Sequence, residues 1–237
     1  MLVRDERHGL AVYLTRRSNS SRFMPSAYVF PGGAVDPSDA EPAMLARVHG
    51  TVGDAPPPVV VAALRELLEE AGILFVLTQG SGTTTQGSHT PLDERLASDL
   101  RARMIAKVPF ATLLAENELA LDATQLVYYS NWITPPTQEV RFDTHFFLAH
   151  APGDQVPSAD AVEVHDGTWF SPADALRRAE RGDLSIIFPT LKHLERLARF
   201  DRIEPLFAHA RERRIVPTRP FEGTAGEIGL TGQSDAW

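Results

Sequence analysis

The chain has 237 residues, 43% of them hydrophobic, which is enough for one large domain or for a domain with appendages. The net charge of −8 argues against a general nucleic-acid binder, and the absence of cysteine excludes a disulfide framework and a thiol nucleophile. No apolar run approaches about 18 residues and the first residues lack the apolar core of a signal peptide, so we expect a cytoplasmic protein without a membrane span.

Hydrophobic periodicity, caps and turn residues predict alternating strands and helices. In chain order, we expect strands at 2–4 and 10–15, a strand that runs into a Gly-rich turn at 28–33, a short helix at 42–48, a helix at 58–71 and a strand at 73–77. Helices at 92–106 and 109–117 follow, then strands at 126–134, 140–150 and 162–170, and helices at 172–181, 191–197 and 203–213. Strands flanked by helices on both sides predict an α/β/α sandwich with a mixed sheet and extra helical segments.

The remaining segments predict loops and appendages to one domain. Residues 34–58 are rich in proline, and residues 78–91 are polar and of low complexity. We therefore expect a single domain over 1–200, with insertions at about 40–58 and 78–117. A C-terminal helix and tail at 201–237 is expected either to pack on this domain or to be flexible.

The stretch RELLEEAG (65–72) places Glu66, Glu69 and Glu70 on one face of the predicted helix. Like charges at this spacing destabilise an isolated helix, and a hard cation bound through their oxygens would remove the repulsion. Arg65 is adjacent and is able to pin one carboxylate. Two interpretations remain open from these residues: a metal site or a solvated helix face.

The order of strand, Pro-Gly-Gly turn, acidic helix and glycine resembles the Nudix box, G-x5-E-x7-R-E-U-x-E-E-x-G-U, in which U is apolar. Gly33 stands at the first position, and residues 65–73 match the second half at every defined position. The chain departs from the box at Asp39, where the pattern has Glu. It also has 25 residues between Asp39 and Arg65 where the box has seven, an insertion of 18.

The resemblance implies a Nudix-type α/β/α sandwich that hydrolyses a nucleoside diphosphate linked to another moiety, with Mg²⁺ or Mn²⁺. Carried over by position, Glu66, Glu69 and Glu70 would hold the metal together with the Gly33 carbonyl. Of these, Glu66 and Glu69, with Arg65, are candidate catalytic residues. Glu163, in a late segment that is similar to the family's own, is a candidate further ligand or base; the alternative is a solvated acid beside a strand.

The segment before the box indicates a substrate class. LTRRSNSSRFMPSAYVFPGG (14–33) resembles L-T-x-R-S/A-x3-R-x3-G-x3-F-P-G-G, the pattern of the coenzyme A diphosphatase branch, except that Ser26 replaces a glycine. The interrupted box is similar to that of peroxisomal-type acyl-CoA diphosphatases. The candidate substrate contacts are Arg17, Arg22 and Arg141. The alternatives are solubilising surface charges for the first two and a strand-edge ion pair for Arg141.

Three functions follow in order of preference. The first is metal-dependent hydrolysis of coenzyme A or acyl-CoA to 3′,5′-ADP and (acyl-)4′-phosphopantetheine. The second is the same chemistry on ADP-ribose, NADH or another nucleoside diphosphate derivative, which the departure at Ser26 keeps open. The third is a non-catalytic nucleotide sensor. The expected partner is a small CoA-type molecule, with no nucleic acid and no membrane, and a homodimer is left open.

Overall fold

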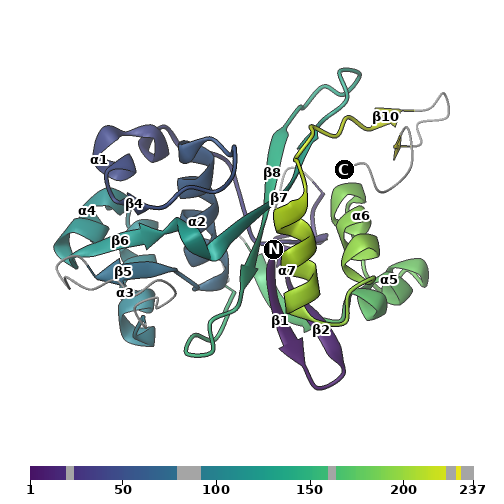
Figure 1. Cartoon of the computed structure of the whole chain (residues 1–237), viewed down its shortest axis with the longest axis horizontal. Coiled ribbons are helices and arrows are strands. Elements are labelled where there is room, and N and C mark those ends of the chain that lie inside the picture. The colour runs from purple at the N-terminus through teal and green to yellow at the C-terminus, as the bar shows by residue number, and fades with distance from the viewer. Residues whose placement is uncertain (20–23, 79–91, 160–163, 223–227, 231–237) are drawn as a thin grey trace.

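A computed structural model describes residues 1–19, 24–78, 92–159, 164–222 and 228–230 (Figure 1). Its main sheet has six strands, in the order β3-β2-β1-β8-β7, with β9 also paired to β2. These strands are β1 (Leu2–Glu6), β2 (Gly9–Arg17), β3 (Tyr28–Val29), β7 (Leu126–Ile133), β8 (Asp143–His150) and β9 (Val164–Phe170). Strands β1 and β8 are parallel and the other pairs are antiparallel, so the sheet is mixed, as predicted.

A second, three-stranded sheet contains part of the insertion. Its order is β4-β6-β5, and its strands are β4 (Val48–His49), β6 (Leu119–Asp122) and β5 (Val76–Thr78). The 3₁₀ helix η1 (Pro37–Ala40) leads into the inserted segment, which forms the helix α1 (Pro42–Leu45) and then supplies β4. Strand β6 was not predicted. The strand predicted at 73–77 begins only at Val76, as β5, and the backbone before it is irregular. There, the Gln155 side-chain amide hydrogen-bonds both the N–H and the carbonyl of Leu74, each at 3.0 Å, in place of a strand partner.

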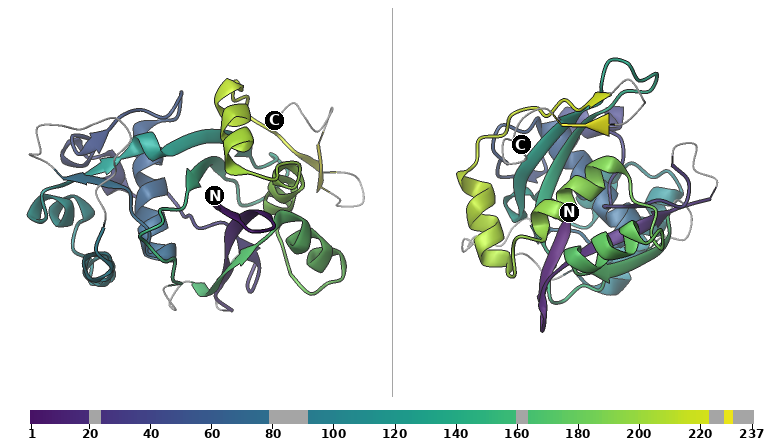
Figure 2. Two further views of the ribbon diagram at one scale, coloured as in Figure 1. Left: turned by 60° about the horizontal axis from the view of Figure 1, so that its bottom comes forward. Right: turned by 90° about the vertical axis from the view of Figure 1, so that its right-hand side faces the viewer.

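Helices cover both faces of the main sheet, which confirms the predicted α/β/α arrangement. On one face lies α2 (Pro57–Ala71), and on the other lie α5 (Pro172–Glu180), α6 (Phe188–Leu197) and α7 (Ile203–Glu212) (Figures 1 and 2). The helices α3 (Glu94–Ile105) and α4 (Phe110–Glu116) pack on α2 and on β6 of the second sheet instead. The short elements η2 (Ala123–Gln125), β10 (Phe221–Glu222) and β11 (Ile228–Gly229) complete the described chain. None of the helices in the described ranges is long and apolar enough to cross a bilayer.

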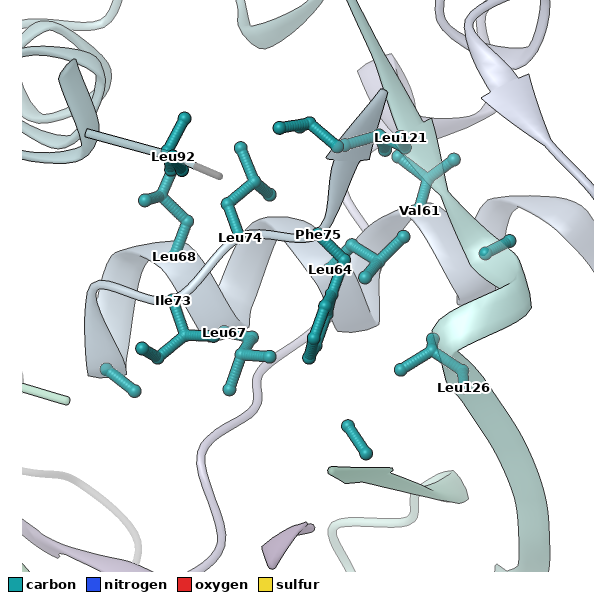
Figure 3. Packing of buried hydrophobic residues seen from close by; sticks show 14 of the residues in the cluster. Val61, Leu64, Leu67, Leu68, Ile73, Leu74, Phe75, Leu92, Leu121 and Leu126 are labelled. Atoms are coloured by element: carbon teal, nitrogen blue, oxygen red, sulfur yellow. The ribbon is translucent and has the colours of Figure 1, made fainter. Parts of the chain in front are cut away.

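Helix α2 is held by apolar packing around much of its circumference. Leu64 and Leu68 are fully buried, and Ile73, Leu74 and Phe75 return over the helix to pack against it (Figure 3). The helix ends at Gly72, which has a φ of 68°, a left-handed conformation that glycine adopts without steric cost. Because the helix axis is fixed in this way, the positions of its polar side chains are fixed as well.

A buried histidine lies in the core on the other face of the sheet. His193 Nδ1 donates to the Pro189 carbonyl at 2.6 Å, so its Nε2 accepts from the Ser130 hydroxyl at 2.7 Å. Its ring packs against Phe146 and Phe30, and Phe30 leads directly into the Pro-Gly-Gly turn. Burial lowers the pKa of His193 to about 3, so the ring is neutral near pH 7.

Candidate functional site

The Pro-Gly-Gly turn lies directly against α2, although 18 extra residues separate the two halves of the motif. The Gly32 N–H donates to Glu70 Oε2 at 2.9 Å. A Cβ atom added to Gly33 would lie 2.5 Å from the carboxyl carbon of Glu66. Gly33 is therefore required by close approach: a side chain at this position would displace a helix carboxylate.

Arg65 is buried and is bonded on several sides. Its Nε and Nη2 donate to the two carboxylate oxygens of Asp39, each at 2.9 Å. Its Nη1 donates to Glu66 Oε1 at 2.8 Å, and its Nη2 also donates to the Ala34 carbonyl at 2.8 Å. Burial by itself lowers the pKa of Arg65, but the bonds to Asp39 and the charge of Glu66 outweigh it and raise the pKa.

Asp39 is the acid whose role the sequence left open, and it is 1% exposed. It lies in η1, where a capping box is formed: the Asp36 side chain accepts from Ser38 N–H and the Asp36 N–H donates to Asp39 Oδ2. The same oxygen also receives Arg65. Asp39 thus ties the start of the insertion to α2. The spacing of the two aspartates was a visible capping signal, but the partner 26 residues away was not.

Glu69 is the most accessible of the three helix carboxylates. Its side chain is 32% exposed, whereas Glu66 and Glu70 are buried. Arg65 Nη1 lies 3.4 Å from each of its oxygens. The Glu69 backbone carbonyl accepts from Arg101 Nε of α3 at 2.7 Å, a contact that no motif in the sequence indicated.

The donor groups at this site suit a hard divalent cation. Three carboxylates and a backbone carbonyl are the oxygen ligands that Mg²⁺ and Mn²⁺ prefer. Within the described ranges, no three His, Asp or Glu side chains are already arranged as a ligand cluster. Glu66 is bonded to Arg65, and Glu70 to the Gly32 N–H. The residues fit the ion because their donor atoms are carboxylate and carbonyl oxygens, and because Gly33 lies close to the Glu66 carboxylate.

Comparison with known proteins identifies the family. The model of the NUDT19 Nudix domain matches residues 41–197, which is more than half of the chain. The chain belongs to the NUDT19 Nudix domain family. A crystal structure of a NUDIX hydrolase from Alicyclobacillus acidocaldarius superposes with a TM-score of 0.73 at 33% identity, over 87% of this chain and 92% of that one. The fold is therefore that of a Nudix hydrolase, as the resemblance implied.

Curated relatives carry related names. The chain is 27% identical to "Putative nudix hydrolase 7" of Caenorhabditis elegans, over 93% of this chain and 66% of the relative. It is also 27% identical to "Acyl-coenzyme A diphosphatase NUDT19" of Xenopus laevis, over 90% of this chain and 64% of the relative. It is 27% identical to the human protein of that name, over 84% of this chain and 63% of the relative. The chain spans slightly less than two thirds of the length of these relatives.

The predicted substrate residues of this Nudix domain lie in different places. Arg17 is half-buried at the end of β2, next to β3, the strand that leads to Gly33. Its backbone N–H donates to the Ala27 carbonyl at 3.0 Å. Arg141 is exposed in the turn between β7 and β8, and its Nε donates to a carbonyl of that same hairpin at 3.4 Å. Arg22 and Glu163 lie outside the described residues.

Ser26 departs from the substrate-class pattern at a position where the backbone explains the expected glycine. Its φ is 61°, in the left-handed region. A residue with a Cβ atom is disfavoured there by roughly 1–2 kcal/mol. The Ser26 hydroxyl donates to the Asn19 side chain, which offsets part of this cost. The Nudix domain thus keeps the turn that the pattern requires with a serine in the position of glycine.

Proposed function

We propose that this chain is a Nudix diphosphatase that hydrolyses the diphosphate of coenzyme A or acyl-CoA with Mg²⁺ or Mn²⁺. The products would be 3′,5′-ADP and (acyl-)4′-phosphopantetheine. The observation that carries the proposal is the packing of the Gly32–Gly33 turn against Glu66 and Glu70, supported by the buried pair of Arg65 and Asp39. The names of the curated relatives support the choice of acyl-CoA as substrate.

Each residue at the site has a proposed role. Glu66, Glu69 and Glu70, with the Gly33 carbonyl, would hold the metal. A divalent cation bound there would offset the charge of the diphosphate and lower the pKa of a bound water. Arg65 holds the carboxylate of Glu66 in place, which makes it a positioning residue.

The proton acceptor is proposed to be Glu69, because its carboxylate is the one of the three that remains accessible. Glu163 stays the second candidate, as a further ligand or base. Arg17, Arg22 and Arg141 are the proposed phosphate contacts, since a substrate that carries several negative charges must approach a chain of net charge −8.

The first test is the substitution Glu70→Gln. The amide retains an oxygen that can accept from the Gly32 N–H, so the turn should stay in place while one anionic ligand is lost. We expect turnover to fall by about two orders of magnitude or more with little change in the thermal midpoint. Glu116→Gln is a matched control, because Glu116 is also a hydrogen-bonded carboxylate but lies in α4 and pairs with Arg103. Near-normal turnover by Glu70→Gln, with an unchanged metal titration, would contradict the proposal.

The second test is a substrate panel with Mg²⁺, analysed by mass spectrometry. Coenzyme A and an acyl-CoA should be cleaved faster than NADH and ADP-ribose. The departure at Ser26 is the specific reason to include the last two, because they are the substrates of the second candidate function. Preference for either would replace coenzyme A as the substrate, and hydrolysis of none of the four would favour the nucleotide sensor.

A further inference from the structure

A concave site lies along the edge of the main sheet, at strand β7. This cleft has a volume of about 360 Å³ and three walls: residues 51–54 before α2, strand β7, and the segment 210–217 at the end of α7. Figure 1 shows β7 passing between α2 and α7. Among the described residues, the lining includes no glutamate of α2 and neither glycine of the Pro-Gly-Gly turn. The carboxylate site therefore does not account for the cleft.

The cleft has a local charge opposite to that of the molecule. In the described part of the chain, its charged lining residues are Arg211, Arg213, Arg214 and Asp54, a formal sum of +2 in a chain of net charge −8. Low-dielectric walls concentrate such a field within a concave surface. The Arg211 guanidinium lies 5.6 Å from the centroid of the Phe207 ring, a contact that restricts its orientation. Because arginine donates paired hydrogen bonds to phosphate oxygens, this wall suits a phosphate group.

The β7 wall of the cleft offers a fixed aromatic ring. Tyr128 lines the cleft, and its ring stacks on Phe147 and His145 at centroid distances of 5.3 and 5.6 Å. The hydrogen bond between its hydroxyl and His145 Nδ1, at 2.6 Å, fixes the ring further. Val52 and Leu126 add apolar surface beside it. An apolar wall with a few convergent polar groups is typical of small-molecule sites of this volume, and its fixed geometry lowers the entropy cost of binding.

We propose that this cleft binds the phosphate-bearing end of a nucleotide, with Arg211 and Arg214 at the phosphate and Tyr128 beside the ring system. An adenosine 3′,5′-bisphosphate unit has both features. It has two sources: the nucleotide end of the substrate, or a free nucleotide. The identification with the substrate rests on the proposed function, whereas binding of the nucleotide itself does not.

The test is calorimetric titration of metal-free protein with adenosine 3′,5′-bisphosphate. The double variant Arg211→Gln/Arg214→Gln should bind at least about tenfold more weakly than the wild type, because charge-assisted bonds to phosphate are lost. Both arginines are exposed, so the fold should be kept. The control Arg177→Gln/Arg181→Gln removes two exposed charges from the region of α5 and should bind as the wild type does. Adenosine, which lacks phosphate, should bind more weakly than the bisphosphate.

Absence of binding by the wild type, or equal binding by the wild type and the cleft variant, would overturn the proposal. Kinetics then separate the two sources. If the substrate occupies the cleft with its 3′-phosphate at Arg211 and Arg214, the variant should raise KM for coenzyme A and leave KM for dephospho-CoA, which lacks this phosphate, unchanged. If a free nucleotide occupies it, both KM values should stay constant while the titration still shows the loss. A chain that hydrolyses no substrate contradicts the proposed function, whereas the titration alone decides the cleft.

Discussion

The substitution Asp39→Asn tests the pairing that joins the insertion to helix α2. Asparagine keeps the shape of aspartate but presents an NH₂ group, so one of the two 2.9 Å bonds from Arg65 is replaced by a donor facing a donor. One charge-assisted hydrogen bond contributes about 1.5–3 kcal/mol, and removing one partner of a buried ion pair costs about 3–5 kcal/mol. Arg65 keeps Glu66 and the Ala34 carbonyl, so we expect the lower value, about 3 kcal/mol.

Urea unfolding followed by tryptophan fluorescence measures this loss as a change in the free energy of unfolding. Asp183→Asn is the matched control: Arg181 Nε and Asp183 Oδ2 are 3.0 Å apart, but both side chains are about half exposed or more. Because exposed pairs contribute little, the control should change the free energy by less than about 0.5 kcal/mol. The turnover of Asp39→Asn should also fall by about tenfold, since Glu66 loses its fixed neighbour. If Asp39→Asn and Asp183→Asn lower the free energy of unfolding by the same small amount, the buried pair of Asp39 and Arg65 does not stabilise the site.

Three further predictions concern single positions. Gly33→Ala should lower turnover by about 100-fold, because its Cβ would lie 2.5 Å from the Glu66 carboxylate, whereas Gly153→Ala, which meets open space, should be neutral. Ser26→Gly should raise the free energy of unfolding by about 0.5 kcal/mol, because the relief of the left-handed conformation exceeds the cost of the added chain entropy. Ser26→Ala should lower the free energy of unfolding, because it removes the hydroxyl that donates to Asn19. The urea midpoints of the wild type and the two variants measure both effects. His193 has a pKa of about 3 when folded and 6.5 in the reference state, so the unfolded chain takes up this proton first. The free energy of unfolding that it contributes should decrease by about 1.4 kcal/mol per pH unit as the pH falls from about 5.5 to 4, a range between the two pKa values. Over that range, unfolding of His193→Gln should show a slope shallower by this amount.

The local elements and the acidic face were readable from the sequence. Helix α2, its end at Gly72 and the hairpin of β1 and β2 follow from hydrophobic period and capping residues, which act within a few positions of the chain. The carboxylates on one face of α2 follow from the helical spacing alone. Even the departure at Ser26 was visible, because the pattern asks for a glycine where the structure has a positive φ.

The tertiary structure decided which of these groups meet. Asp39 reaches Arg65 across 26 positions, Arg101 reaches the Glu69 carbonyl across 32, and Gln155 replaces a strand partner for Leu74 across 81. None of these contacts has a local signature, since each depends on how separate elements pack. The cleft at the edge of β7 also forms only when α7 packs beside this strand. Local periodicity specifies the secondary structure of each segment. The packing of the two clusters of buried apolar residues decides which polar groups must find hydrogen-bond partners far away in the sequence.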